Sequence, residues 1–300
     1  MTTSVWLCAA ALALAGDPDN PLLKELAERG LPADGAGKVC AKFDAPTMPD
    51  GLDAAAQRKV IEQAAAGRDV NELLRNSIVS PFVMKISDLP LEGAAEPLRR
   101  VDVWYVAYGP LDAFFSERFL ESMADLGGGG TAKKGKLPSA RHVLKEAELK
   151  AQGIEPRDAD DLKERWWFAM GALFDRVLIS STRRTVATRH GDSVIVAAAV
   201  DPRFNGHKEY GNWWRKVEVR GEQPPDYGPV RPYVASASYS KITRLAEPAG
   251  AVFIEHHHIF AEPNDWFDGK NLLRSKLPMV VQDSVRTLRR ELRNAPPPVE

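Results

Sequence analysis

The stretch Ala251-Val-Phe-Ile-Glu-His-His-His-Ile-Phe-Ala261 decides the fold. It is an apolar run of strand length, rich in β-branched and aromatic residues, so it predicts a strand with apolar groups on both faces. The loop Glu262–Gly269 and the amphipathic segment Leu272–Leu292 follow it, and the latter has the apolar spacing of a long helix. Together they predict an α+β fold in which an antiparallel sheet grips the C-terminal helix, with further helices at the N-terminus.

The histidine triplet of this strand is divided between its two faces. Alternate residues of a strand share a face, so His256 and His258 project together, while His257 lies on the other face with Glu255. Their Cα atoms are then roughly 7 Å apart, which lets two imidazoles converge on a metal. A zinc site needs a third protein ligand, and the remaining histidines lie in unrelated contexts: His142, His190 and His207. We interpret the triplet as wall residues hydrogen-bonded to neighbouring strands, with a metal site as the alternative.

Upstream of this strand the sequence has the period of two that is typical of β-structure. The connection His190-Gly191-Asp192 predicts a hairpin, because Gly supplies positive φ in a short turn. The connections between successive strands are too short for helical crossovers, so we expect an antiparallel meander. The five predicted strands are Val177–Arg189, Ser193–Val200, Trp214–Arg220, Tyr233–Leu245 and Ala251–Ala261.

The first half of the chain predicts one more hairpin and several helices. Ser77–Ser87 and Arg100–Tyr108 favour strands that pair with each other. The stripe of large apolar residues in Asp158–Phe174 has helical spacing and predicts a helix. Pro278 suits a first helical turn, so the regular part of the last helix is expected to begin near Lys276. The other predicted helices are Pro21–Arg29, Leu52–Ala66, Leu111–Leu126 and Arg141–Gln152.

Composition limits the classes of function. The chain has 300 residues, 44% hydrophobic and 27% charged, with a net charge of -1, which is typical of a globular protein and argues against a dedicated nucleic-acid binder. We expect a helical and linker-like region over residues 16–76, a single α+β domain over 77–294 and a Pro-rich tail over 295–300.

The first fifteen residues resemble a secretory signal peptide. Their apolar run is too short to span a bilayer, and Ala13-Leu14-Ala15 offers a small-x-small cleavage pattern. We expect a secreted or periplasmic protein, and the alternative is a buried apolar element of a cytoplasmic protein, since no Lys or Arg precedes the run. After cleavage Cys40 would be the only cysteine, which favours a small buried or half-buried hydrophobe.

Two motif-like segments carry no chemistry. The stretch Gly130–Lys136 copies the spacing of a phosphate-binding loop, but Leu137 replaces the required Ser or Thr and a predicted helix precedes it. The serines of Tyr233–Leu245 lack the turn that exposes a nucleophile. The carboxylates show no acid/base spacing, and Glu255 alone is embedded in an apolar strand. The sequence therefore predicts no cofactor and defines no catalytic residue.

The order of elements resembles the helix-grip fold of START-like and polyketide-cyclase-like proteins over Ser77–Leu292. The resemblance is carried by the last two predicted strands, by the corner Pro263-Asn-Asp-Trp-Phe-Asp-Gly269 and by Leu277–Leu292. It implies a cavity between sheet and helix for an apolar small molecule. The residues that could supply polar or aromatic groups to such a pocket are Tyr233, Tyr239, His256, His258 and Trp266.

Three hypotheses follow. The first is an exported protein that binds an apolar small molecule or lipid. The second is a hydrolase or cyclase-like enzyme on the same scaffold, with His256 or His258 as general base. The third is an envelope or protein-interaction module that uses the Trp213-Trp214 loop and a basic helix face able to contact anionic lipids. That face consists of Arg286, Arg289, Arg290 and Arg293.

Overall fold

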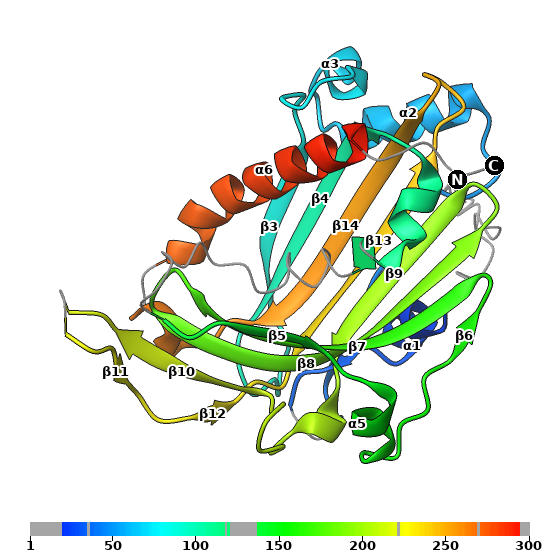
Figure 1. Cartoon of the computed structure of the whole chain (residues 1–300). Coiled ribbons are helices and arrows are strands. Elements are labelled where there is room, and N and C mark those ends of the chain that lie inside the picture. Colours follow the sequence, from blue (N-terminus) through cyan, green and yellow to red (C-terminus); the bar gives the residue numbers. More distant parts are fainter. Residues whose placement is uncertain are drawn as a thin grey trace, which may run out of the picture.

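The protein is built on one large antiparallel sheet with a long helix along one face (Figure 1). The computed structural model describes residues 20–34, 37–117, 119–120, 137–220, 223–268 and 271–294. The predicted α+β class, with its antiparallel sheet and C-terminal helix, is confirmed. The segments Met1–Ala15 and Gly130–Lys136 and the tail 295–300 lie outside the described residues.

The main sheet has 12 strands, and its central path runs β10-β8-β9-β13-β14-β4-β3. We call the side of the sheet that carries α6 (Leu272–Arg293) the helix face and the opposite side the outer face. The strands are β3 Val83–Leu89, β4 Leu98–Tyr108, β5 Ala140–Val143, β6 Asp158–Ala159, β7 Leu162–Leu173, β8 Val177–His190, β9 Ser193–Val200, β10 Trp213–Glu218, β11 Asp226–Tyr227, β12 Arg231–Pro232, β13 Ser236–Arg244 and β14 Ala251–Ala261.

A small second sheet, several helices and short turns complete the described part. The second sheet pairs β1 (Leu31–Pro32) with β2 (Cys40–Ala41). The remaining elements are α1 Pro21–Glu28, α2 Ala54–Ala64, α3 Val70–Leu74 and α5 Glu146–Lys150, with 3-10 turns η1 Leu111–Phe115, η2 Pro202–Phe204 and η3 Asn264–Phe267. The helix α6 already begins at Leu272 and contains Pro278, so its regular part starts four residues earlier than expected.

The predicted helix over Asp158–Phe174 is wrong. That segment forms β6 and β7, and β7 pairs with β8 from Leu162 opposite Thr188 to Leu173 opposite Val177. Both faces of the sheet are covered here, so Trp166 and Trp167 are both buried although they point to opposite sides. A strand buried on both faces loses the alternation of polar and apolar residues, and its apolar residues then imitate helical spacing.

Other expectations hold only in part. The hairpin of β8 and β9 and the pairing of β13 with β14 are confirmed. The predicted meander breaks at β10, which pairs with the first part of β8 and not with β9. Arg141–Gln152, predicted as one helix, forms the strand β5 followed by the single-turn helix α5. Of Leu111–Leu126, the structure shows η1 and helical backbone at residues 117, 119 and 120, and residues 118 and 121–126 lie outside the described part.

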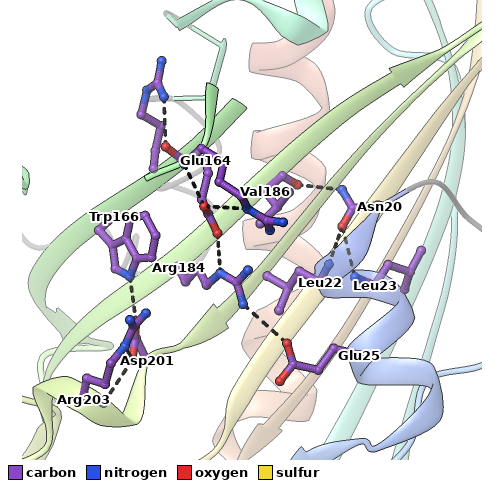
Figure 2. A network of polar contacts seen from close by, with 12 residues as sticks. Asn20, Leu22, Leu23, Glu25, Glu164, Trp166, Arg184, Val186, Asp201 and Arg203 are labelled. Atoms are coloured by element: carbon purple, nitrogen blue, oxygen red, sulfur yellow. Dashed lines mark hydrogen bonds and ion pairs between the residues drawn. The ribbon is translucent and has the colours of Figure 1, made fainter. Parts of the chain in front are cut away.

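The N-terminal region covers the outer face and is not a loose linker. The side chains of Leu22, Leu23 and Leu26 on α1 join a buried cluster with Val186 and Ala197. Figure 2 shows the start of α1, where the Asn20 side chain caps the helix by accepting from Leu22 N and Leu23 N. The same amide donates to Val186 O at 2.9 Å, which docks α1 on β8.

Further along, Met48 and the helices α2 and α3 bury apolar side chains against β4 and β14. The sheet is therefore sandwiched between α6 and residues 20–76. Within the described ranges, no helix combines the length and the apolar character needed to cross a membrane.

Candidate functional site

A row of polar side chains crosses the helix face at the middle of the sheet. His256 and His258 project together from β14, as the sequence predicted, with ring centroids 6.2 Å apart. Ser240 Oγ lies 2.8 Å from His256 Nδ1, and Ser236 Oγ lies 2.9 Å from His258 Nε2. Antiparallel pairing places these groups of β13 and β14 beside one another, because residues in register share a face. The row therefore consists of two hydrogen-bonded Ser–His pairs that lie next to each other on the helix face.

The imidazoles of this row are neutral at pH 7. Burial lowers the pKa of His256 to about 4 and the pKa of His258 well below its usual value. A charged imidazole is disfavoured where water is largely replaced by protein. A base with so low a pKa accepts protons weakly near neutral pH. This weakens the hypothesis that either histidine is a general base.

Arg183 adds a permanent charge to the same row. It lies on the helix face of β8, and its guanidinium donates to Ser236 Oγ at 3.1 Å. Burial lowers the pKa of Arg183, but a guanidinium stays protonated under ordinary conditions. Sequence reasoning missed this residue, because Arg183 and Arg184 are adjacent in β8 and nothing in that strand shows which of the two faces the histidines.

Tyr233 and Trp266 lie together at one end of the helix face. Their ring centroids are 6.0 Å apart, and Trp214 packs on Trp266 at 6.0 Å. All three side chains are buried in the main core. Tyr233 and Trp266 are therefore core side chains, at the end of the sheet where η3 turns the chain from β14 toward α6.

The predicted Trp213-Trp214 interaction loop is wrong. Both residues belong to β10, where Trp214 is buried in the core and the ring of Trp213 lies under the guanidinium of Arg215. Successive side chains of a strand point to opposite faces of the sheet, so β10 buries one of these two tryptophans. A loop would not impose that burial.

Tyr239 lies on the outer face and does not join the other candidate residues. Its ring stacks on His257 at 4.7 Å, and its hydroxyl donates to Asp44 O at 3.2 Å. The grouping of Tyr239 with His256 and His258 is therefore wrong. The error arises from register: Tyr239 pairs with His257, so the sheet separates it from the other two imidazoles.

His257 anchors a buried charge network on the outer face. Its Nδ1 lies 2.7 Å from Asp102 Oδ1, and its Nε2 lies 3.2 Å from Glu255 Oε2. Glu255 also accepts from the backbone N–H of Thr47 at 2.5 Å and of Met48 at 3.1 Å. The network ties the segment around Thr47 to the sheet. With His257 only 3% exposed, the arrangement is structural and offers no substrate access.

A second outer-face network is shown in Figure 2. Glu164 of β7 accepts from Arg184 Nε at 2.7 Å, and Asp201 accepts from Trp166 Nε1 at 2.7 Å and from Arg203 Nε at 3.0 Å. Arginine partners lower the pKa of both carboxyls against the opposing effect of burial. These residues line a cavity of about 560 Å³ between α1 and β7. Each buried carboxylate already has a cationic partner, so the cavity presents a neutralised surface.

A larger cavity of about 900 Å³ lies where the β3–β4 connection faces the start of α6, and Arg99, Glu262 and Phe267 are among its lining residues. Arg99 binds Glu262 at 2.5 Å and Asp88 at 2.7 Å. Tyr233, His256, His258 and Trp266 do not line this cavity or the one beside α1.

The basic face predicted on α6 is interrupted. Arg289 is buried, and its guanidinium donates to Val106 O at 3.0 Å and to backbone oxygens of Ser80 and Pro81. The prediction that Arg289 contacts a membrane is wrong, because this side chain pins α6 to β4. Arg290 and Arg293 are exposed, and Arg286 is half-buried.

Across the described ranges, no three His, Cys, Asp or Glu side chains are gathered in a way that could hold an ion.

Comparisons with known proteins do not assign a family. No family model matches the sequence, and no curated protein matches it. Among solved structures, CalU16 from Micromonospora echinospora aligns over 72% of this chain and 99% of its own, at 10% identity and a TM-score of 0.21. So low a score carries no argument about the fold or the function.

Proposed function

We propose that the protein binds a small apolar molecule or lipid in a pocket between the helix face of the sheet and α6. The observation that carries the proposal is a contrast between the two faces at the middle of the sheet. On the outer face, Ala197, Tyr239 and His257 are at most 3% exposed. On the helix face, Ala198, Ser238 and His258 beside them keep accessible surface.

The side chains of the opposing surface under α6 are also incompletely buried. Leu277 and Val281 of the helix pack against the main core but are only half-buried, and so are Met84 and Ile86 on β3. Between Leu273 and Val285, α6 has no fully buried side chain. Protein interiors are ordinarily packed as densely as organic crystals. Two apolar surfaces that face each other without burying their side chains therefore favour an additional apolar occupant.

Buried side chains of the main core lie at both ends of this region: Tyr233 and Trp266 at the start of α6, and Leu288 and Leu292 toward its end. The proposed ligand would lie between them with the row of His256 and His258 beneath it. We also propose export of the protein to the periplasm or the exterior, on the basis of the leader-like Met1–Ala15.

A pair of adjacent alanines on β9 tests the proposal. Ala198→Phe adds volume on the helix face, where space is proposed, and Ala197→Phe adds the same volume on the packed outer face. We expect Ala198→Phe to keep the thermal midpoint within a few degrees and to abolish binding of an apolar probe such as 1-anilinonaphthalene-8-sulfonate. We expect Ala197→Phe to lose about 1–3 kcal/mol of stability by overpacking.

Native mass spectrometry of the purified protein supplies an independent reading. A bound small molecule in the wild type, lost in Ala198→Phe, supports the proposal. Equal destabilisation by both substitutions, together with a ligand-free wild type that takes up no probe, contradicts it.

A further inference from the structure

We infer that a small cavity at the C-terminal end of α6 binds a phosphate group, with Arg293 as its hydrogen-bond donor and Arg289 as a second positive charge. The cavity measures about 250 Å³ and lies between the last turns of α6, the end of β4 and the segment that follows α3. Figure 1 shows this end of α6 beside α2 and α3, away from the start of the helix. His256, His258 and Val281 do not line the cavity, so it is a site separate from the proposed apolar pocket.

The wall of this cavity carries two positive charges and no negative one. Arg289 and Arg293 both line it, and none of its described lining residues is an Asp or a Glu. Glu291, the acidic residue beside them on the helix, is exposed and is not part of the wall. A concave surface with charges of one sign raises the local concentration of counter-ions. The cavity therefore favours an anionic ligand.

Arg289 is a buried cation whose partners are all uncharged. Its side chain is 5% exposed, and its hydrogen bonds go to the backbone oxygens of Val106, Ile78, Ser80 and Pro81. Within the described part of the chain no carboxylate pairs with it. Buried charges are normally paired with an opposite charge. An anion in the adjoining cavity would supply that opposite charge.

Arg293 supplies the hydrogen-bond donors that Arg289 cannot. The N–H groups of Arg289 are already used by backbone oxygens, whereas Arg293 is exposed and forms no ion pair with a described residue. The amide of Asn76 and the hydroxyl of Ser77 also line the cavity, and both groups can donate. A guanidinium binds two phosphate oxygens at once, a geometry for which arginine is favoured over lysine.

The end of the helix opposes an anion only weakly. A helix C-terminus carries about half a negative elementary charge, whereas Arg289 and Arg293 together bring two positive charges. The N–H of Asn294 donates to the backbone oxygens of Arg290 and Glu291 at 3.2 Å, which satisfies part of the helix end. Arg290 lies in the same turn but outside the cavity wall, where it complements the helix dipole.

An apolar side chain beside the cavity favours a lipid headgroup as the source of the phosphate. Val79 follows the cavity-lining Ile78 in the chain and is 62% exposed. Its N–H donates to Ser77 Oγ at 3.3 Å, which ties it to the cavity wall. Exposed apolar groups beside basic ones are typical of surfaces that contact anionic membranes. The other source is a soluble phosphate ester, which would not need Val79.

Two probes that carry the same phosphate group test the inference on the full-length protein. Glycerol 3-phosphate is titrated by calorimetry, and vesicles of phosphatidylcholine with phosphatidic acid are compared with pure phosphatidylcholine vesicles by co-sedimentation. We expect the wild type to bind glycerol 3-phosphate and the vesicles that contain phosphatidic acid. Arg293→Gln should weaken both interactions about tenfold, because a charge-assisted hydrogen bond is lost. The matched control Arg290→Gln should change either by less than about twofold.

A third variant, Val79→Ser, distinguishes the two sources of the phosphate. Vesicle binding that needs both Arg293 and Val79 assigns the phosphate to a lipid headgroup. Binding of glycerol 3-phosphate that needs Arg293, with no binding of vesicles, assigns it to a soluble ester. Either result supports the phosphate site.

Three results overturn the inference. The first is that the wild type binds neither probe. The second is that Arg293→Gln and Arg290→Gln lose binding equally, because the probes are then attracted by the basic helix as a whole. The third is that Arg293→Gln binds both probes as the wild type does. Arg293 and Arg290 are both exposed, so both variants should keep the thermal midpoint of the wild type, and unfolding does not account for a loss of binding.

Discussion

Replacing Asp102 with Asn should reveal how much the outer-face charge network contributes to stability. Asp102 is 3% exposed. It accepts from Arg100 Nε at 2.9 Å and lies 2.7 Å from His257 Nδ1. Removing one partner of a buried ion pair costs about 3–5 kcal/mol. Because Arg100 keeps Asp44 and His257 keeps Glu255, we expect a loss of about 3 kcal/mol.

The pH dependence of this network has a defined sign. Hydrogen bonds from His257 and Arg100 hold the pKa of Asp102 below its usual value, against burial. Its contribution is therefore present above about pH 4 and is lost as the pH falls through the folded pKa. Carboxylates at Asp102 and Glu255 raise the pKa of His257 against burial. Its contribution is complete below about pH 6.5 and is lost as the pH rises through its folded pKa.

Urea unfolding at a series of pH values measures both effects. The wild type should be most stable relative to Asp102→Asn between about pH 4 and 6.5, the window set by the two unfolded pKa values. Asp88→Asn is the control, because Asp88 also pairs with an arginine but its side chain is 71% exposed, and it should cost at most about 1 kcal/mol. A loss in Asp102→Asn no larger than that of the control at pH 5.5 would refute the reasoning.

Three further substitutions test the fold, each by urea or thermal unfolding. Arg289→Met should cost about 2–4 kcal/mol, because it leaves several buried backbone oxygens without donors, and the exposed Arg290→Met should change stability by less than about 0.5 kcal/mol. Gly191 has φ +51°, so Gly191→Val should cost about 1–2 kcal/mol while Gly191→Asn is tolerated better. Asn20→Ala should cost at least about 1 kcal/mol, since the amide both caps α1 and binds β8.

The outcomes that contradict these predictions are equally specific. Equal effects of Arg289→Met and Arg290→Met would mean that the guanidinium does not hold α6 to β4. An unchanged midpoint in Gly191→Val would mean that the hairpin does not need positive φ. Loss of stability in Asn20→Ala no greater than that of an ordinary surface substitution would mean that α1 is not docked through its cap.

Local sequence patterns predicted those strands in which the hydrophobicity of successive residues follows the period of a strand. The turn at Gly191 and the run Ala251–Ala261 were found because short connections and strand periodicity act over a few residues. β7 was missed for a tertiary reason. Its residues Trp166 and Trp167 are both buried, because α5 and η2 cover one side and the main core the other, and this covering is not encoded in the local spacing.

The candidate site likewise combines a feature that the sequence predicted with features that only the structure shows. Alternation on β14 was enough to separate His256 from His257, and the structure confirms it. The placement of Tyr239 and Arg183 depended on which residues of β13 and β8 come into register with β14. A shift of one residue in that register would exchange their faces. Register is set by pairing across the whole sheet, so neither position could be assigned from its own strand.

The sequence by itself determined the α+β class, the pairing of the last two strands and the closing helix, because hydrophobic periodicity specifies these elements locally. Only the tertiary structure decided that residues 20–76 seal the outer face while the helix face beneath Leu277 and Val281 stays incompletely buried. The physical reason is that burial is a property of what packs against a strand. Two faces with similar residues become a closed core and a proposed binding surface according to what covers each.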